Sequence, residues 1–121
     1  MDIALDVMGG DNAPHAPVQG AIKAVKNSRF DLKLILIGDE LSIKKELGGF
    51  KSESISILHA SENITSSDQA SKVIKTKPDS SMVKGIRLLK EKKAGAFISA
   101  GNTGAQMATS LLTLGRIPHV K

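Results

Sequence analysis

The segment Phe97-Ile98-Ser99-Ala100-Gly101-Asn102-Thr103-Gly104-Ala105 decides the fold, because an apolar strand runs into a glycine-flanked Asn-Thr pair and then into a helix. Gly101 and Gly104 let the backbone turn tightly and approach a ligand closely. The first amides of the helix lack intrahelical partners, and together with the helix dipole they favour a bound anion such as phosphate. The alternative is an ordinary strand-to-helix connection in which Asn102 or Thr103 is the N-cap.

A second turn of the same kind lies near the N-terminus, where the apolar run at 3–7 leads into Met8-Gly9-Gly10-Asp11-Asn12-Ala13-Pro14. Two glycines in this loop can expose successive amides, and an Asp-Asn pair adds a carboxylate and a carboxamide: Gly9, Gly10, Asp11 and Asn12. The loop is therefore a second candidate for binding phosphate or a polar substrate. The alternative is that its Asp-Asn pair only caps and turns the chain.

Strand and helix patterns alternate along the rest of the chain. Short apolar runs predict strands at 3–7, 32–37, 54–59 and 96–99. Helical spacing of apolar residues predicts helices at 16–27, 41–47, 67–75 and 102–114, and a further helix capped by Ser80. This alternation predicts βαβ units, and hence an α/β fold of three layers, α/β/α, with a mainly parallel sheet. Ligands of such sheets bind at the carboxyl ends of the strands, where both glycine turns lie.

A third candidate site is the segment Lys75-Thr76-Lys77-Pro78-Asp79-Ser80-Ser81-Met82, which places two cations and two hydroxyls at a helix N-terminus. Serine side chains at a helix start, with a lysine nearby, can hold an anion by charge and by hydrogen bonds. The alternative is that Asp79 or Ser80 only caps the helix and that the lysines are solvated.

The composition bounds the class of protein. A length of 121 residues fits one domain, and a hydrophobic fraction of 40% is enough for a core packed from aliphatic residues. The net charge of +5 favours an acidic partner, although lysine-rich helices are usually just solvated faces. With three Phe and no Tyr or Trp, the chain offers little for bases to stack on, and we expect no nucleic-acid partner.

Several kinds of site are excluded by the residues themselves. The absence of cysteine excludes disulfides and thiolate chemistry, and the three histidines lack the spacing of metal ligands. No catalytic-serine elbow, nucleoside-triphosphate P-loop or dinucleotide fingerprint occurs. We expect no signal peptide at the N-terminus, and no apolar run approaches the roughly 20 residues that span a bilayer. The sequence thus predicts small-anion chemistry in a soluble protein, without a metal or a cofactor.

Four blocks of sequence, taken together, resemble a known family: MDIALDVMGGDNAP at 1–14, ILIGDE at 35–40, DSSM at 79–82 and ISAGNTGA at 98–105. In this order they closely resemble the bacterial phosphate acyltransferases of phospholipid synthesis. The resemblance implies a Rossmann-like fold similar to those of the phosphotransacetylases and the isocitrate and isopropylmalate dehydrogenases. It also implies formation of acyl phosphate from acyl-[acyl carrier protein] and inorganic phosphate. By the same comparison, residues 1–121 are the N-terminal part of a single catalytic domain, about its first third.

Phosphate is itself the nucleophile in that reaction, so the protein must position it, exclude water and stabilise the oxyanion formed at the thioester carbonyl. The resemblance therefore implies catalytic roles for Asp11, Lys77 and Asn102. It implies contacts to phosphate or to the acyl thioester from the other polar and glycine residues of the three turns: Gly9, Gly10, Asn12, Ser80, Ser81, Ser99, Gly101, Thr103 and Gly104. Many family members carry a run of basic residues before DSSM, where this chain has Lys75-Thr76-Lys77-Pro78.

The resemblance also implies acyl carrier protein and inorganic phosphate as partners, a homodimer for the whole protein, and a cytoplasmic location with peripheral association at the inner face of the membrane. Two other functions fit the same residues. One is a phosphotransacetylase-like enzyme that uses acyl-CoA, which a comparison of the two thioester carriers would separate. The other is a noncatalytic module that binds phosphate without turnover.

Overall fold

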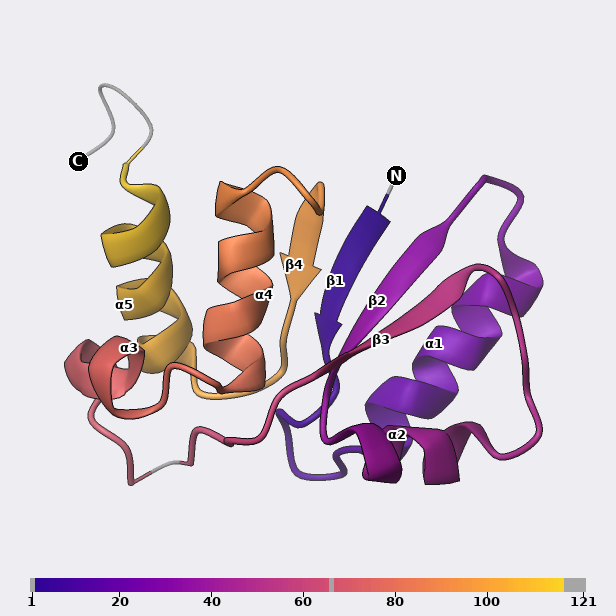
Figure 1. Ribbon diagram of the computed structural model, residues 1–121, viewed down its shortest axis with the longest axis horizontal. Coiled ribbons are helices and arrows are strands. Elements are labelled where there is room, and N and C mark those ends of the chain that lie inside the picture. The colour runs from indigo at the N-terminus through magenta and orange to yellow at the C-terminus, as the bar shows by residue number, and fades with distance from the viewer. Residues whose placement is uncertain (1, 66, 117–121) are drawn as a thin grey trace.

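The computed structural model describes residues 2–65 and 67–116, and its sheet has four strands that are all parallel. The sheet order is β3-β2-β1-β4 (Figure 1), formed by β1 (Asp2–Asp6), β2 (Lys33–Gly38), β3 (Ile55–His59) and β4 (Ala96–Ile98). Every strand begins and ends within one residue of its predicted bounds. The predicted parallel sheet is therefore confirmed.

The helices are α1 (His15–Asn27), α2 (Glu40–Leu47), the short 3-10 helix η1 (Ala70–Lys72), α3 (Val73–Thr76), α4 (Ser81–Lys90) and α5 (Thr103–Leu114). They confirm the helices predicted at 16–27, 41–47 and 102–114, and Ser80 caps α4 as expected. The helix predicted from residue 67 is wrong at its start. Asp68 accepts the Thr65 amide at 2.6 Å upstream instead of capping a helix downstream.

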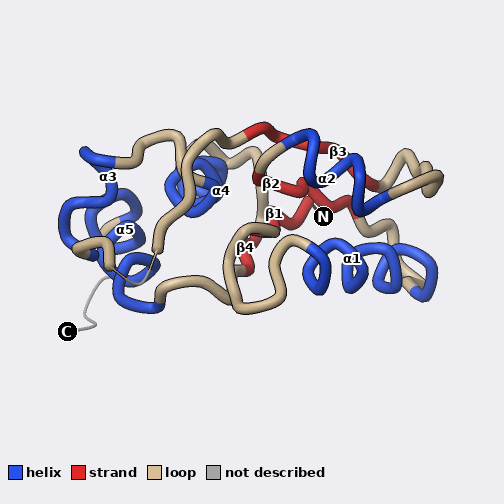
Figure 2. The backbone as a smooth tube through the Cα atoms, turned by 90° about the horizontal axis from the view of Figure 1, so that it is seen from below, coloured by secondary structure: helices blue, strands red, loops and turns tan. Residues whose placement is uncertain are grey.

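Side chains of the sheet alternate between two apolar layers, as pleating requires. On one face, Leu34 and Leu36 of β2 pack with α1 and α2. On the other face, Ile35 and Ile37 of the same strand pack with Leu88 of α4. Figure 2 shows α1 on one side of the sheet and α4 and α5 on the other. Because both faces are covered, the strands read as continuous apolar runs, and the three-layer α/β/α prediction is confirmed.

The direction of the chain across the sheet changes at β1, which pairs with β2 on one side and β4 on the other. The loop after β1 leads to α1 on one face, whereas the loop after β4 leads to α5, which packs on α4 at the other face. Loops that part in this way leave a crevice at the carboxyl ends of the two strands. The strand order therefore brings both glycine turns to one place.

A further prediction concerns the membrane. None of the helices within residues 2–65 and 67–116 has the length and apolarity to cross a bilayer.

Candidate functional site

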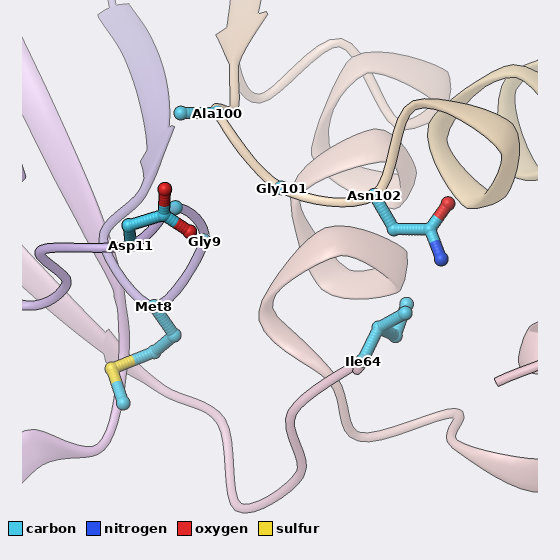
Figure 3. Close-up of a pocket in the computed structure, with 8 residues that line it drawn as sticks. Met8, Gly9, Asp11, Ile64, Ala100, Gly101 and Asn102 are labelled. Atoms are coloured by element: carbon cyan, nitrogen blue, oxygen red, sulfur yellow. The ribbon is translucent and has the colours of Figure 1, made fainter. Parts of the chain in front are cut away.

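A cavity of about 490 Å³ opens between the loops that follow β1 and β4. The first loop contributes Met8 to Asp11, the second contributes Ala100 to Asn102, and Ile64 closes one side (Figure 3). Five of the site residues proposed from the sequence line this cavity: Gly9, Gly10, Asp11, Gly101 and Asn102. The two glycine turns, which are separated by most of the chain, thus form one site.

The two turns approach each other so closely that Gly9 has no room for a side chain. A Cβ built on Gly9 would lie 2.7 Å from the nitrogen and 2.8 Å from the Cα of Gly101, and 2.9 Å from Asp6 Oδ2. The next residue, Gly10, has a φ of +97°, which favours glycine. Glycine at these positions is therefore required by backbone proximity and by backbone conformation respectively.

A buried carboxylate that the sequence prediction missed lies directly behind this contact. Asp6, the last residue of β1, accepts hydrogen bonds from the Ser81 hydroxyl at 2.6 Å and the Ser99 hydroxyl at 2.7 Å. It also accepts the Met8 amide at 2.9 Å, and Ser99 Oγ in turn accepts the Gly101 amide at 3.0 Å. In this arrangement the hydroxyl protons of both serines are donated to Asp6 and not toward a ligand.

Asn102 directly precedes α5 and is its N-cap, so the capping interpretation is correct for this residue. Its Oδ1 accepts the Ala105 amide at 3.0 Å, and its Nδ2 donates to the Thr65 carbonyl at 3.3 Å. Among the described residues, the amides of Thr103 and Gly104 donate no hydrogen bond, as expected of a first helical turn. The helix start therefore keeps donors for an anion even though Asn102 is a cap.

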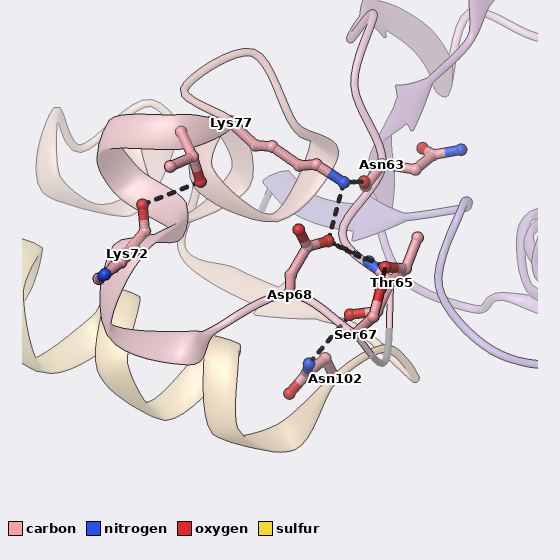
Figure 4. A network of polar contacts seen from close by, with 8 residues as sticks. Asn63, Thr65, Ser67, Asp68, Lys72, Lys77 and Asn102 are labelled. Carbon is pink, nitrogen blue, oxygen red and sulfur yellow. Dashed lines mark hydrogen bonds and ion pairs between the residues drawn. The ribbon is translucent and has the colours of Figure 1, made fainter.

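Lys77 lies outside the cavity wall and is held by the segment that carries Ile64. Its Nζ donates to the Asn63 carbonyl at 2.5 Å and forms an ion pair with Asp68 Oδ2 at 2.8 Å (Figure 4). The Lys77 ammonium and the Thr65 amide hold the pKa of the Asp68 carboxyl below its usual range. The interpretation of Lys77 as a merely solvated lysine is therefore wrong.

The serines before and at the start of α4 are both buried. Ser80 is the N-cap, and its Oγ accepts the Val83 amide at 3.3 Å, which confirms the capping alternative for this residue. Asp79 is engaged by the Ser61 hydroxyl and by Lys84 Nζ at 2.6 Å, and these contacts, that of Lys84 first, hold the pKa of its carboxyl well below the usual range. This turn thus joins α4 to the segment after β3.

Asn12 does not line the first cavity. It lines a second, mostly apolar cavity of about 380 Å³ on the other side of the loop, together with Leu5, Ala16 and Ile98. Its carbonyl accepts the Ala16 amide at 2.9 Å at the start of α1. Gly9, Gly10 and Asp11 line both cavities, so this short loop is the partition between them.

Charge at the first cavity comes from a single lining residue in the described part of the chain, the carboxylate of Asp11. Affinity for an anion would therefore rest on main-chain donors and on the N-terminal end of α5, unless a lysine moves in from outside. The lysine that the sequence analysis proposed for this role, Lys77, is occupied by Asp68. No group of His, Cys, Asp and Glu residues within the described ranges is suited to hold a metal ion.

Comparison with known proteins finds close relatives. The chain is 50% identical over 122 residues to the phosphate acyltransferase of Alkaliphilus oremlandii and 45% identical over 123 residues to that of Chlorobaculum parvum. These alignments cover 99% and 100% of this chain and 36% of each relative, so the chain spans about a third of their length. The phosphate acyltransferase of Acetivibrio thermocellus is likewise 50% identical over 122 residues, with 99% of this chain and 36% of the relative covered. Residues 1–121 match the family model described as "Fatty acid synthesis protein", and the chain therefore belongs to that family.

Proposed function

We propose that the chain is the phosphate-binding part of an acyltransferase that forms acyl phosphate from acyl-[acyl carrier protein] and inorganic phosphate in phospholipid biosynthesis. The observation that carries this proposal is the meeting of two glycine turns and the N-terminus of α5 around one cavity. Main-chain amides at such a place suit a small tetrahedral anion. The relatives' name, phosphate acyltransferase, supplies the class of reaction.

In the proposed reaction, an oxygen of hydrogen phosphate attacks the carbonyl carbon of the acyl thioester. A carbon–oxygen bond forms, and collapse of the tetrahedral intermediate breaks the carbon–sulfur bond. The carrier thiol leaves with the proton that hydrogen phosphate gives up, and acyl phosphate remains. Because phosphate is the nucleophile, the protein's task is to orient it and to stabilise the oxyanion.

Roles for the individual residues follow from where they lie. We propose that Asn102 and the amides of Thr103 and Gly104 hold the phosphate, since the Gly101 amide already donates to Ser99 Oγ. The opposite wall is formed by the loop from Gly9 to Asp11, in which Asp11 faces the acyl thioester. Lys77 would bind the phosphate only after its ion pair with Asp68 breaks, since the Asp68 carboxylate and the phosphate compete for the same ammonium group. Ser80, Ser81 and Ser99 would shape the site, since one is a buried cap and the other two donate to Asp6.

The partners and the setting of the whole protein are part of the same proposal. We propose acyl carrier protein and inorganic phosphate as the partners, a homodimer as the assembly, and a cytoplasmic location with peripheral contact to the inner face of the membrane. The net charge of +5 supports an acidic carrier and an anionic surface alike.

The experiment measures acyl phosphate formation by this chain and by a form extended to the length of its relatives, with acyl carrier protein and coenzyme A as alternative carriers. Asn102→Ala and Lys77→Ala should each lower the rate, with Lys75→Ala as the control lysine outside the network. A loss of less than about threefold in both variants would refute these two assignments. Turnover with acyl-CoA alone would favour a phosphotransacetylase-like enzyme, and phosphate binding without turnover in the extended form would favour a binding module.

A further inference from the structure

Asp6 is a buried charged group to which the proposed reaction assigns no part. Its side chain is 3% exposed, and it belongs to none of the ion pairs found among the described residues. A buried carboxylate without a cation is costly unless several donors hydrogen-bond to it. Its position at the end of β1 therefore depends on the donors around it.

Three donors from three parts of the chain converge on this carboxylate. They are the Ser81 hydroxyl at 2.6 Å, the Ser99 hydroxyl at 2.7 Å and the Met8 amide at 2.9 Å. Ser81 is the first residue of α4, so the positive end of that helix adds to the stabilisation. Asp6 thus ties the carboxyl end of β1 to the start of α4 and to the loop after β4.

The link through Ser99 reaches the cavity wall. Ser99 Oγ donates to Asp6 and accepts the Gly101 amide at 3.0 Å, so the carboxylate, the hydroxyl and the amide form one chain of hydrogen bonds. The backbone of Gly101 packs closely against Gly9, and the next residue, Asn102, is the N-cap of α5. Charge-assisted hydrogen bonds of this kind are stronger than neutral ones and more exacting in geometry.

We propose that Asp6 is a positioning residue: acting through Ser99, it holds the turn at Gly101 and so sets the start of α5 against the loop at Gly9. The inference rests on the proposed function only in naming phosphate as the ligand. Removing the negative charge of Asp6 would by itself favour a nearby anion. A loss of phosphate binding in a neutral variant therefore reports lost positioning and not lost charge.

The test uses this chain with three substitutions, Asp6→Asn, Ser99→Ala and the two combined, and Asp2→Asn as a control that removes the same charge from the far end of β1. Amide hydrogen exchange at Gly101 reports on the turn, and exchange at Leu36, buried in β2, reports on global stability. Titration with inorganic phosphate, followed at the amides of α5, reports on the site.

Each single substitution should speed exchange at Gly101 by about tenfold or more, with Leu36 changed less than about threefold. Both substitutions remove the charge-assisted hydrogen bond between Asp6 and Ser99, and Ser99→Ala also removes the acceptor of the Gly101 amide. Both single substitutions should raise the dissociation constant for phosphate. The double variant should have a dissociation constant no higher than that of the more affected single variant. Asp2→Asn should change neither the exchange rate at Gly101 nor the dissociation constant. Four results would each overturn the inference. Exchange at Gly101 could stay unchanged, or exchange at Leu36 could be accelerated as much as exchange at Gly101. Asp6→Asn could bind phosphate more tightly, or the double variant could show the product of the two single effects on the dissociation constant. If the unsubstituted chain fails to bind phosphate, the proposed function fails, and exchange at Gly101 still decides the role of Asp6.

Discussion

Substituting Gly9 by alanine tests whether the contact between the two turns shapes the site. The new Cβ would stand 2.7 and 2.8 Å from backbone atoms of Gly101 and 2.9 Å from a carboxylate oxygen that already accepts a hydrogen bond. Contacts of 3.4 Å and above are ordinary, so these atoms must separate by about half an ångström or more, and two of them belong to the main chain. Overpacking of this kind costs about 3 kcal/mol, and the lower entropy of the unfolded alanine chain offsets less than about 1 kcal/mol of it.

We therefore expect Gly9→Ala to lower the free energy of unfolding by about 2 kcal/mol, which is about 8 °C in melting temperature for a domain of this size. Gly20→Ala is the matched control, since it lies within α1 and its Cβ meets nothing within 4 Å. In a helix interior that change should stabilise the chain by about 0.5 to 1 kcal/mol. Thermal and denaturant unfolding of the two variants measure both effects, and a Gly9→Ala protein as stable as the Gly20→Ala protein would refute the reasoning.

Three further predictions concern charge, capping and the surface. Asp68 and Asp79 have pKa values lowered from 3.8, so each carboxylate stabilises the fold above pH 3.8, and this stabilisation is lost as the pH falls below that value. In Asp79→Asn the free energy of unfolding should therefore fall less steeply with decreasing pH in the acid range. Ser80→Ala should cost about 1 to 2 kcal/mol in denaturant unfolding, because it removes a buried N-cap; an unchanged midpoint would contradict this. The exposed apolar residues of α5, among them Leu111, should cause concentration-dependent self-association in sedimentation, which Leu111→Lys weakens and Leu41→Lys, on α2, does not.

The fold was predictable because local and global signals agree. The run at 32–37 is apolar on both faces, which is the pattern of a parallel strand between two helical layers. Glycines and capping residues mark the turns between elements, and Asn102 caps α5 at the predicted place. The start of the helix expected at 67 was misplaced because the choice of Asp68 between an upstream and a downstream amide is made by loop geometry, which residue types do not reveal.

Less of the candidate site could be predicted. The glycine turns carry local signals, and strand order places them together. Asp6 was missed because its serine partners lie 75 and 93 residues away, and a single acid at the end of a strand looks like a loop residue. The pairing of Lys77 with Asp68 depends on how the chain folds back after β3, so sequence pattern alone left that lysine free for a ligand.

The place of β1 in the sheet also bears on the order in which the chain is assembled during synthesis. Ile3 pairs with Leu34 on one side and with Ala96 on the other, so the edge of β1 that faces β4 stays open long after the edge that faces β2 can be paired. Contacts between segments so distant in sequence close slowly. We expect the half of the sheet formed by β1, β2 and β3 to gain protection first, and the crevice between β1 and β4 to be the last part of the described chain to take shape.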